Sequence, residues 1–293
     1  MSFDLYQTIT DRIIAELESG IIPWERPWTG TSDGAVSYGT GKPYSLLNQF
    51  LIRDPGEYIT LNEINRLGGK LKKGSKAKII VFWRILQSTK KDADGNVVRD
   101  GEGMPVPVSY PVLRYHNVFH LDDTIGIEPK HKSDAPVNDI HPVEKAETTL
   151  NSFLSREHIQ RRNVRGNRAF YNPMTDSITL PLMEQFVSAE EYYSTAFHEC
   201  VHSTGHPRRL KRISSTQFSG FGSEEYSKEE LVAEIGSCAL MHQLKLETTR
   251  TFRNTSAYIQ SWLRALRNDK RLIVNAAGQA EKAVNLIVDK CEK

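Results

Sequence analysis

The sequence contains little cysteine, no long apolar run and almost no excess of charge. Its three cysteines, Cys200, Cys238 and Cys291, form no Cys-x-x-Cys pair, which excludes a disulfide framework and a cysteine-based zinc site. No run of about 18 apolar residues is present, so no membrane-spanning helix is expected. Because the net charge is only +2, any nucleic-acid surface must be a local patch rather than a whole-chain excess of positive charge.

The opening segment, MSFDLYQTITDRIIAELESG, places charged residues among its apolar positions. A secretory signal needs an uninterrupted apolar core, so we expect a cytoplasmic protein without a membrane partner. Hydrophobic residues make up 39% and charged residues 25% of the chain, which is typical of a soluble protein with a packed core. A length of 293 residues favours two domains over one.

The first half of the chain mixes helical and extended patterns. Residues 4–19 have the apolar periodicity of an amphipathic helix. A short helix is expected over 61–67, and strands over 79–85 and 110–121, where β-branched and aromatic residues gather. The polar segment between these strands contains an Asp-Gly-Asn turn and predicts an exposed hairpin tip.

The second half is predicted to be mainly helical with a small sheet. The segment RAFYNPMTDSITLP has strand and turn signals and predicts a hairpin. Helical patterns lie at 143–157, 189–204, 228–246, 255–268 and 274–290.

The predicted fold class is α+β, an N-terminal α+β domain followed by a mainly helical domain with a small sheet. Residues 126–143 are rich in Pro, Asp and Lys and have no periodicity, as a linker would. The predicted first domain is therefore 1–125 and the second 144–293.

The stretch HECVH, residues 198–202, matches the HExxH motif of zinc peptidases. Ser188 and Glu191 form a capping box in front of it, so a helix should start at 189 and stop at Gly205. The alternative to a metal site is a helix that carries two ordinary histidines.

On such a helix, His198 and His202 lie one turn apart and project from the same face. A tetrahedral zinc ion needs this arrangement from two imidazoles. Glu199 points about 100° away, because successive helical residues differ by that angle. Glu199 therefore has the position of a general base rather than of a ligand.

A catalytic zinc needs a third protein ligand. The longer pattern HExxHxxGxxH would place a histidine at 208, but Arg208 is there and His206 comes two residues too early. The segment SKEELVAEIG instead carries Glu230 and Glu234 at i, i+4 on one helical face. We expect Glu230 to bind the metal and Glu234 to orient a histidine from behind, and the reverse assignment stays open.

Ser227 and Glu230 also fit a capping box, which would give Glu230 a purely structural role. A metal is nevertheless the better interpretation, because two histidines and an i, i+4 carboxylate pair are costly to bury without one. Zn²⁺ is the expected ion, although Mn²⁺ or Co²⁺ also suits two histidines and a glutamate.

Basic and aromatic residues gather in the first half, notably around the loop GGKLKKGSKAK. Lysines neutralise phosphates and aromatic rings stack on unpaired bases, so the combination is typical of a groove for single-stranded DNA. The candidate DNA-binding residues are Trp24, Arg26, Trp28, Tyr44, Lys70, Lys72, Lys73, Lys76, Lys78, Trp83, Arg114 and Tyr115.

The alternative interpretation of this region is a solvated lysine turn beside core aromatic residues. Trp83 lies inside the apolar run IIVFW and favours a core position. Trp24 and Trp28 flank a proline-rich loop and are expected to be more exposed.

Several longer segments resemble one known family in order along nearly the whole chain. TDRIIAELESGIIPWERPW, LGGKLKKGSKAKIIVFW and VLRYHNVFHLDDTIG resemble the N-terminal domain of the ArdC antirestriction family, which TraC-type plasmid primases share. FYNPMTDSITLP, YYSTAFHECVHSTGHPRRLKR and FGSEEYSKEELVAEIGS resemble the second domain of the same family.

The resemblance implies a first domain that binds single-stranded DNA and a zincin-like metallopeptidase second domain. Together they would protect incoming plasmid or phage DNA from host restriction during conjugation. By position, His198 and His202 would be metal ligands and Glu199 the catalytic glutamate. The Glu230 and Glu234 pair resembles the ExxxD helix of thermolysin-like enzymes, although the gap from His202 to Glu230 is longer here.

If the site is active, a host protein is the implied substrate, and Tyr226 and His206 are the candidates for stabilising the transition state. Two other functions stay open. One is a non-catalytic DNA-coating protein with structural zinc, and the other is a replication accessory factor such as a primase partner.

Overall fold

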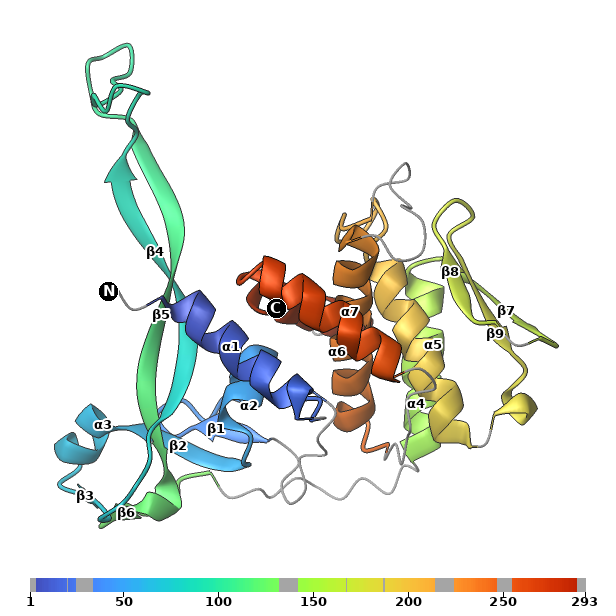
Figure 1. Ribbon diagram of the computed structural model, residues 1–293, viewed down its shortest axis with the longest axis horizontal. Helices are drawn as coiled ribbons and strands as arrows, with labels where there is room; N and C mark the ends of the chain where they lie inside the picture. The colour runs from blue at the N-terminus through green and yellow to red at the C-terminus, as the bar shows by residue number, and fades with distance from the viewer. Residues whose placement is uncertain are drawn as a thin grey trace.

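A computed structural model describes residues 4–19, 21–24, 34–131, 142–166, 168–186, 188–213, 224–246 and 255–288. The chain forms an N-terminal lobe, residues 4–131, and a largely helical C-terminal lobe, residues 142–288 (Figure 1). This arrangement confirms the predicted α+β class and the mainly helical second half. No helix within the described ranges is long and apolar enough to cross a membrane.

The N-terminal lobe is built around a four-stranded sheet in the order β1-β2-β5-β4. Strand β1 runs parallel to β2, and the other neighbours are antiparallel. A second small sheet pairs β3 with β6. The elements are α1 (Leu5–Glu18), β1 (Ala35–Ser37), α2 (Leu46–Ile52), β2 (Gly56–Thr60), α3 (Leu61–Arg66), β3 (Lys70–Leu71), β4 (Lys78–Thr89), β5 (Pro107–His120), a 3₁₀ turn η1 (Leu121–Asp123) and β6 (Thr124–Ile125).

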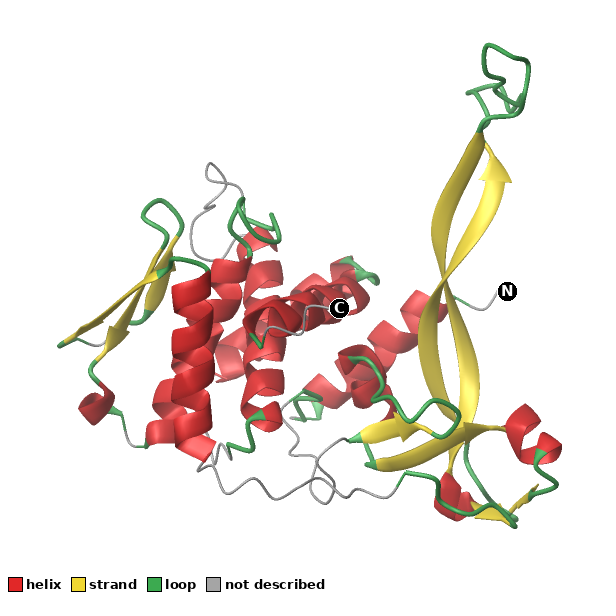
Figure 2. Cartoon of the chain, turned by 180° about the vertical axis from the view of Figure 1, so that it is seen from behind, coloured by secondary structure: helices red, strands yellow, loops and turns green. Residues whose placement is uncertain are grey.

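Strands β4 and β5 form a long two-stranded ribbon that extends away from the rest of the molecule (Figures 1 and 2). Both strands are longer than the sequence predicts, and they pair without interruption from Lys78 opposite Val118 to Thr89 opposite Pro107. The predicted polar tip lies at the far end. Its turns are closed by Asp92 and Asp100, whose carboxylates accept hydrogen bonds from backbone N–H groups of the tip.

The C-terminal lobe packs its helices beside a three-stranded sheet in the order β7-β9-β8. The predicted hairpin is confirmed as β8 and β9, whereas β7 was missed because its sequence, QRRNV, is almost entirely polar. The elements are α4 (Pro142–Arg156), β7 (Gln160–Val164), β8 (Phe170–Asn172), β9 (Ser177–Pro181), a 3₁₀ turn η2 (Met183–Gln185), α5 (Ala189–Thr204), α6 (Glu224–Gln243), α7 (Thr255–Asn268) and α8 (Leu272–Ile287).

One hydrophobic core continues through both lobes. Helix α1 starts at its N-cap Asp4, whose side chain accepts a hydrogen bond from the Gln7 N–H, and its apolar face packs on α7 and α8. The Thr10 hydroxyl, fully buried, donates to the Lys270 carbonyl at 2.8 Å. Helix α2 packs against both β4 and α8. The contacts of α1 therefore cross the predicted domain boundary.

The start of the predicted linker lies against the N-terminal lobe. The backbone N–H groups of Lys130 and His131 donate to the Glu57 carboxylate at 3.2 and 2.6 Å. The Tyr38 hydroxyl donates to the Glu128 carbonyl at 3.3 Å. Residues 128–131 are therefore held to the sheet, although their composition predicts a linker.

Because α1 packs on the C-terminal lobe, we expect Ile13→Ala to destabilise the whole molecule. Ile13 is 1% exposed, and truncating such a side chain typically lowers the free energy of unfolding by about 2–5 kcal/mol. Urea denaturation followed by circular dichroism measures the effect. Ile85→Ala on the exposed ribbon is the matched control and should change stability by less than about 0.5 kcal/mol. Similar small decreases in both variants would show that α1 is not part of the shared core.

Candidate functional site

Helix α5 carries the HExxH motif and has the predicted boundaries. Its N-cap Ser188 accepts a hydrogen bond from the Glu191 N–H at 3.3 Å, and Gly205 is the C-cap. Cys200 points into the core, where burial raises the pKa of its thiol. The motif thus lies on a well-defined helix whose opposite side is anchored in the core.

His198, His202 and Glu230 bring one ligand atom each to a common point, all within 4.8 Å of one another. The two Nε2 atoms lie 3.1 Å apart. A carboxylate oxygen of Glu230, on helix α6, lies 3.5 Å from the Nε2 of His198, and the other lies 3.3 Å from the Nε2 of His202. Two helices separated by a loop therefore converge on one small space.

The outward nitrogens of the imidazoles face two further carboxylates of α6. Glu234 lies 3.5 Å from the Nδ1 of His198, and Glu229 lies 3.3 Å from the Nδ1 of His202. A carboxylate behind an imidazole fixes the tautomer that presents Nε2 as the free ligand atom. The arrangement favours Glu230 as the ligand and Glu234 as the orienting residue.

Sequence reasoning missed Glu229, the partner of His202, and Arg212, which holds it. The Arg212 guanidinium donates two hydrogen bonds to the Glu229 carboxylate, at 2.9 and 3.1 Å. Arg212 also donates to the Val201 carbonyl and the Thr204 hydroxyl at the end of α5. The adjacent glutamates at 229 and 230 were a weak signal for Glu229, but no pattern in the sequence connects Arg212 to the motif.

The carboxylates dominate the electrostatics of the cluster. Burial alone would lower the pKa values of both imidazoles, but Glu230 and Glu234 raise the pKa of His198, and Glu229 and Glu230 raise that of His202. Burial would likewise raise the pKa of Glu230, yet the two imidazoles hold it well below its usual range. The centre of the cluster therefore favours positive charge.

The donor set fits a divalent cation. Two neutral imidazole nitrogens and one carboxylate are a typical ligand set for a zinc site that keeps an open position. Carboxylates on both Nδ1 atoms provide the supporting hydrogen bonds that such ligands usually have. Within the described residues this is the one cluster of histidine, cysteine and carboxylate side chains that meets the distances for a metal.

Glu199 lies on the same helix but is turned toward the small sheet. It is 7% exposed, and its Oε2 accepts a hydrogen bond from the Tyr171 N–H of β8 at 2.8 Å. Tyr171 is itself placed by Arg209 and Asp176, to which its hydroxyl is hydrogen bonded. Strand β8 at the sheet edge therefore fixes the orientation of the Glu199 carboxylate.

The other sequence predictions around the site had different outcomes. The capping box at Ser227 is wrong, because α6 already begins at Glu224 and the Ser227 hydroxyl is hydrogen bonded to Ser261. The His206 Nδ1 accepts a hydrogen bond from the Arg208 N–H at 3.2 Å. The side chain of Tyr226 lies outside the described residues.

The tryptophans of the predicted DNA groove are placed opposite to expectation. Trp24 is 4% exposed, and its ring packs edge-on against Trp262 of α7 at 5.4 Å, so its prediction as an exposed DNA-stacking ring is wrong. Trp83 is 51% exposed, so its prediction as a core residue is also wrong. It follows Val81, a core residue of β4, by two positions. Arg26 and Trp28 lie outside the described residues.

The candidate DNA-binding residues of the ribbon do not all lie on the same face. Trp83 pairs with Leu113 and Val81 with Tyr115, whereas Arg114 pairs with Phe82. Because paired residues share a face and faces alternate along a strand, Trp83 and Tyr115 lie on one face and Arg114 on the other. Tyr44 lies apart from both strands, in the loop before α2, and is half-buried.

The lysine-rich loop lies at the opposite end of β4 from the ribbon tip. The ammonium groups of Lys72 and Lys78 contact the Asp122 carbonyl at 2.5 Å and the Asp54 carboxylate at 3.2 Å, respectively. Lys70, Lys73 and Lys76 are exposed to solvent. These three residues are therefore the better candidates for contacts with phosphate.

Two family models match the chain. The model for the N-terminal domain of the anti-restriction factor ArdC matches residues 3–119, and a zincin-like metallopeptidase model matches residues 148–279. The second match contains the HExxH helix and helix α6, which together carry the candidate ligands. The two matched segments lie one in each lobe.

Some relatives of known sequence are much longer than this chain, and another is of similar length. Two DNA primases named TraC from Escherichia coli are 33% and 32% identical over 97% and 94% of this chain, which spans only 27% and 19% of their lengths. An uncharacterized protein of Sinorhizobium fredii is 29% identical over 95% of this chain and 90% of its own.

Two crystal structures of the antirestriction protein ArdC from plasmid R388 superpose on nearly the whole chain. The metal-free structure has a TM-score of 0.72 and covers 97% of both chains, and the Mn(II)-bound structure has a TM-score of 0.73 and covers 99% of both. The sequence identity is 32% in each case.

The geometry predicts different metal affinities for Glu230→Gln and Glu234→Gln. Removing the carboxylate that faces both Nε2 atoms should abolish stoichiometric metal binding. Removing the Glu234 carboxylate, which faces the Nδ1 of His198, should keep one bound metal per chain. The affinity for that metal should fall roughly 10–100-fold, as is usual for a residue that orients a ligand. Metal content after dialysis and competition with a chromogenic chelator measure both effects. Equal weakening in the two variants would contradict the assignment of Glu230 as the ligand.

Proposed function

Because this chain belongs to the ArdC antirestriction family, we propose that it protects incoming plasmid or phage DNA from host restriction in the recipient cytoplasm. The N-terminal lobe binds the single strand, and the C-terminal lobe carries a zinc-dependent peptidase site. The observation that carries this proposal is the convergence of His198, His202 and Glu230 beside a buried Glu199 on the same helix.

The residues around the site would have separate chemical roles. A bound zinc ion would supply Lewis-acid polarisation of a peptide carbonyl. His198, His202 and Glu230 would hold it, and Glu199 would act as the general base that takes a proton from the attacking water. The Tyr171 N–H holds Oε2 of Glu199, which leaves Oε1 for the proton, since no other described residue donates to it. The substrate would be a host protein.

One observation favours a second function, a non-catalytic protein that coats DNA and uses the metal only for stability. The hydrogen bond from the Tyr171 N–H gives Glu199 a structural partner, so its burial has a reason other than catalysis. A role as a replication accessory factor is motivated by the likeness to TraC primases, but no cluster of carboxylates typical of a primase site is recognisable in the sequence.

Glu199→Gln distinguishes the peptidase from the coating protein. The amide oxygen can still accept the hydrogen bond from the Tyr171 N–H, so the fold, the bound metal and the DNA affinity should be unchanged. Loss of the general base should reduce protein cleavage, and with it DNA protection, by roughly 100-fold or more. Metal content, oligonucleotide binding and conjugation into a restricting host are measured on the same variant. Full protection by this variant would favour the coating function.

The exposed lysine loop should bind phosphates. We expect the double variant Lys73→Gln, Lys76→Gln to bind single-stranded DNA of every sequence more weakly. The slope of log affinity against log salt should fall by about 0.7 for each phosphate that the loop no longer neutralises. Fluorescence anisotropy titrations over a series of salt concentrations measure this slope. Lys145→Gln, on the exposed side of α4, is the charge-matched control, and an equal effect in that variant would show that the loop has no special role.

A further inference from the structure

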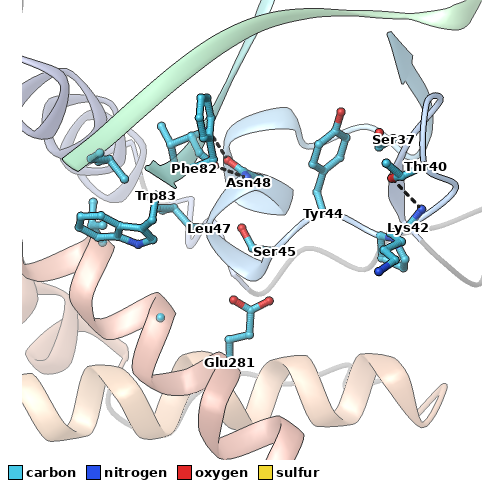
Figure 3. A pocket seen from close by; sticks show the side chains of 15 residues that line it. Ser37, Thr40, Lys42, Tyr44, Ser45, Leu47, Asn48, Phe82, Trp83 and Glu281 are labelled. Carbon is cyan, nitrogen blue, oxygen red and sulfur yellow. Dashed lines mark hydrogen bonds between the residues drawn. The ribbon is translucent and has the colours of Figure 1, made fainter. Parts of the chain in front are cut away.

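A cavity of about 410 Å³ lies between the two lobes, away from the metal cluster. Its walls come from the loop before α2, from the first half of β4, and from the face of α8 that contains Gly278 and Glu281. Figure 3 shows Glu281 reaching from α8 toward Ser45 and Tyr44, with Trp83 to one side and Lys42 to the other. Sites for small organic groups typically have volumes of this order.

The cavity combines an aromatic ring with a cation at its rim. Trp83 is half-exposed although it is the largest apolar side chain on its face of the ribbon. Tyr44 is half-buried, and Lys42 is exposed. A flat π-face and a positive charge at opposite ends of one cavity suit a site that stacks an unpaired base and holds a phosphate of the same strand.

Gly278 is exposed and leaves the α8 wall of the cavity without a side chain. It lies in the middle of α8, where glycine weakens a helix relative to alanine. Its φ is not positive, and a methyl group built on it would meet no protein atom within 4 Å. Neither the backbone nor the packing of the protein therefore requires a glycine. Close approach of a ligand to the helix would require one.

Glu281 lies in the wall of the cavity with a carboxylate that has no cation beside it among the described residues. Its carboxylate accepts a hydrogen bond from the Leu46 N–H at the start of α2, and burial raises its pKa. One carboxylate oxygen of Glu281 therefore caps the start of α2, because the N-cap residue Ser45 makes no side-chain cap hydrogen bond there. The second carboxylate oxygen can accept a donor from a ligand.

We propose that this cavity takes one unstacked nucleobase of a DNA single strand, stacked on Trp83 and backed by Gly278, with Glu281 accepting a hydrogen bond from the exocyclic amino group of the base. The proposal rests on the single-strand binding proposed above and adds base selectivity to it. The lysine loop lies roughly 20 Å back along β4, at about 3.3 Å for each residue between Lys76 and Trp83. One strand can therefore contact both.

A carboxylate prefers a base that presents a hydrogen-bond donor to one that presents an acceptor. Cytosine presents an amino group at C4, whereas uracil presents a carbonyl oxygen at the same position. Facing Glu281, the amino group gains a charge-assisted hydrogen bond, and the carbonyl meets an acceptor that it cannot satisfy. The two pyrimidines are nearly equal in size, so stacking on Trp83 does not separate them.

The first test compares deoxycytidine and deoxyuridine homopolymers of equal length, which place the same base in the cavity in every register. The wild type should bind the cytidine strand roughly tenfold more tightly. Glu281→Gln keeps an oxygen for the Leu46 N–H but presents an amide N–H₂ to the base, so the preference should vanish or reverse. Equal binding of both strands by the wild type overturns the proposal, and so does a preference that Glu281→Gln leaves unchanged.

The second test separates binding from stability. Gly278→Ala should raise the melting temperature by roughly 2 °C, because alanine favours the helix, yet weaken binding of the cytidine strand several-fold by filling the cavity. Thr148→Ala, at an exposed position in α4 far from the cavity lining, should stabilise similarly without changing affinity. Unchanged affinity in Gly278→Ala overturns the cavity as the site.

Different results would reject the proposed single-strand binding and the proposed base pocket. If the wild type binds neither homopolymer, single-strand binding fails and the base pocket fails with it. If it binds both strands equally, with a salt dependence that the lysine variant reduces, the proposed function stands and only the base pocket is rejected.

Discussion

The close approach of α5 and α6 is the constraint on which the candidate metal centre depends. A Cβ at Gly236 of α6 would lie 2.8 Å from a methyl group of Val201 on α5, so only glycine allows this separation. Val201 directly precedes His202, and Gly236 follows Glu234 by two residues. At this spacing, carboxylates on one helix reach both nitrogens of each imidazole on the other, whereas a wider spacing would leave the imidazoles without their partners.

The features of the site that could be predicted are those encoded within one helix. Capping residues and the i, i+4 spacing of His198 and His202 are local properties, and the structure places them as the sequence predicts. The role of Glu229 depends on Arg212 in a loop, so it could not be inferred from any periodicity. The misleading capping box at Ser227 shows the limit of local signals, because a Ser-x-x-Glu pattern fits the interior of a helix as well as its start.

The tryptophans were misplaced because burial is decided by contacts that are remote in sequence. Trp24 follows a proline and looks like a loop residue, but its partner Trp262 comes from α7 near the other end of the chain. Trp83 lies in an apolar run, but only Val81 and the residues before it reach the core. Beyond the pair of Trp83 with Leu113, the two strands continue without a layer to cover them. The apolar run therefore predicted the strand correctly and its environment incorrectly.

The shared core fixes the position of one lobe relative to the other. Helix α8 contacts α2 of the N-terminal lobe and also packs on α5 and α6, which carry the metal cluster. A strand bound against α8 would therefore be held at a fixed position relative to the cluster. Two lobes joined only by a flexible tether would lack this constraint, because each would sample many orientations. On the proposed function, a peptidase at the cluster would cut only those proteins that reach it while the proposed strand occupies the cavity on α8.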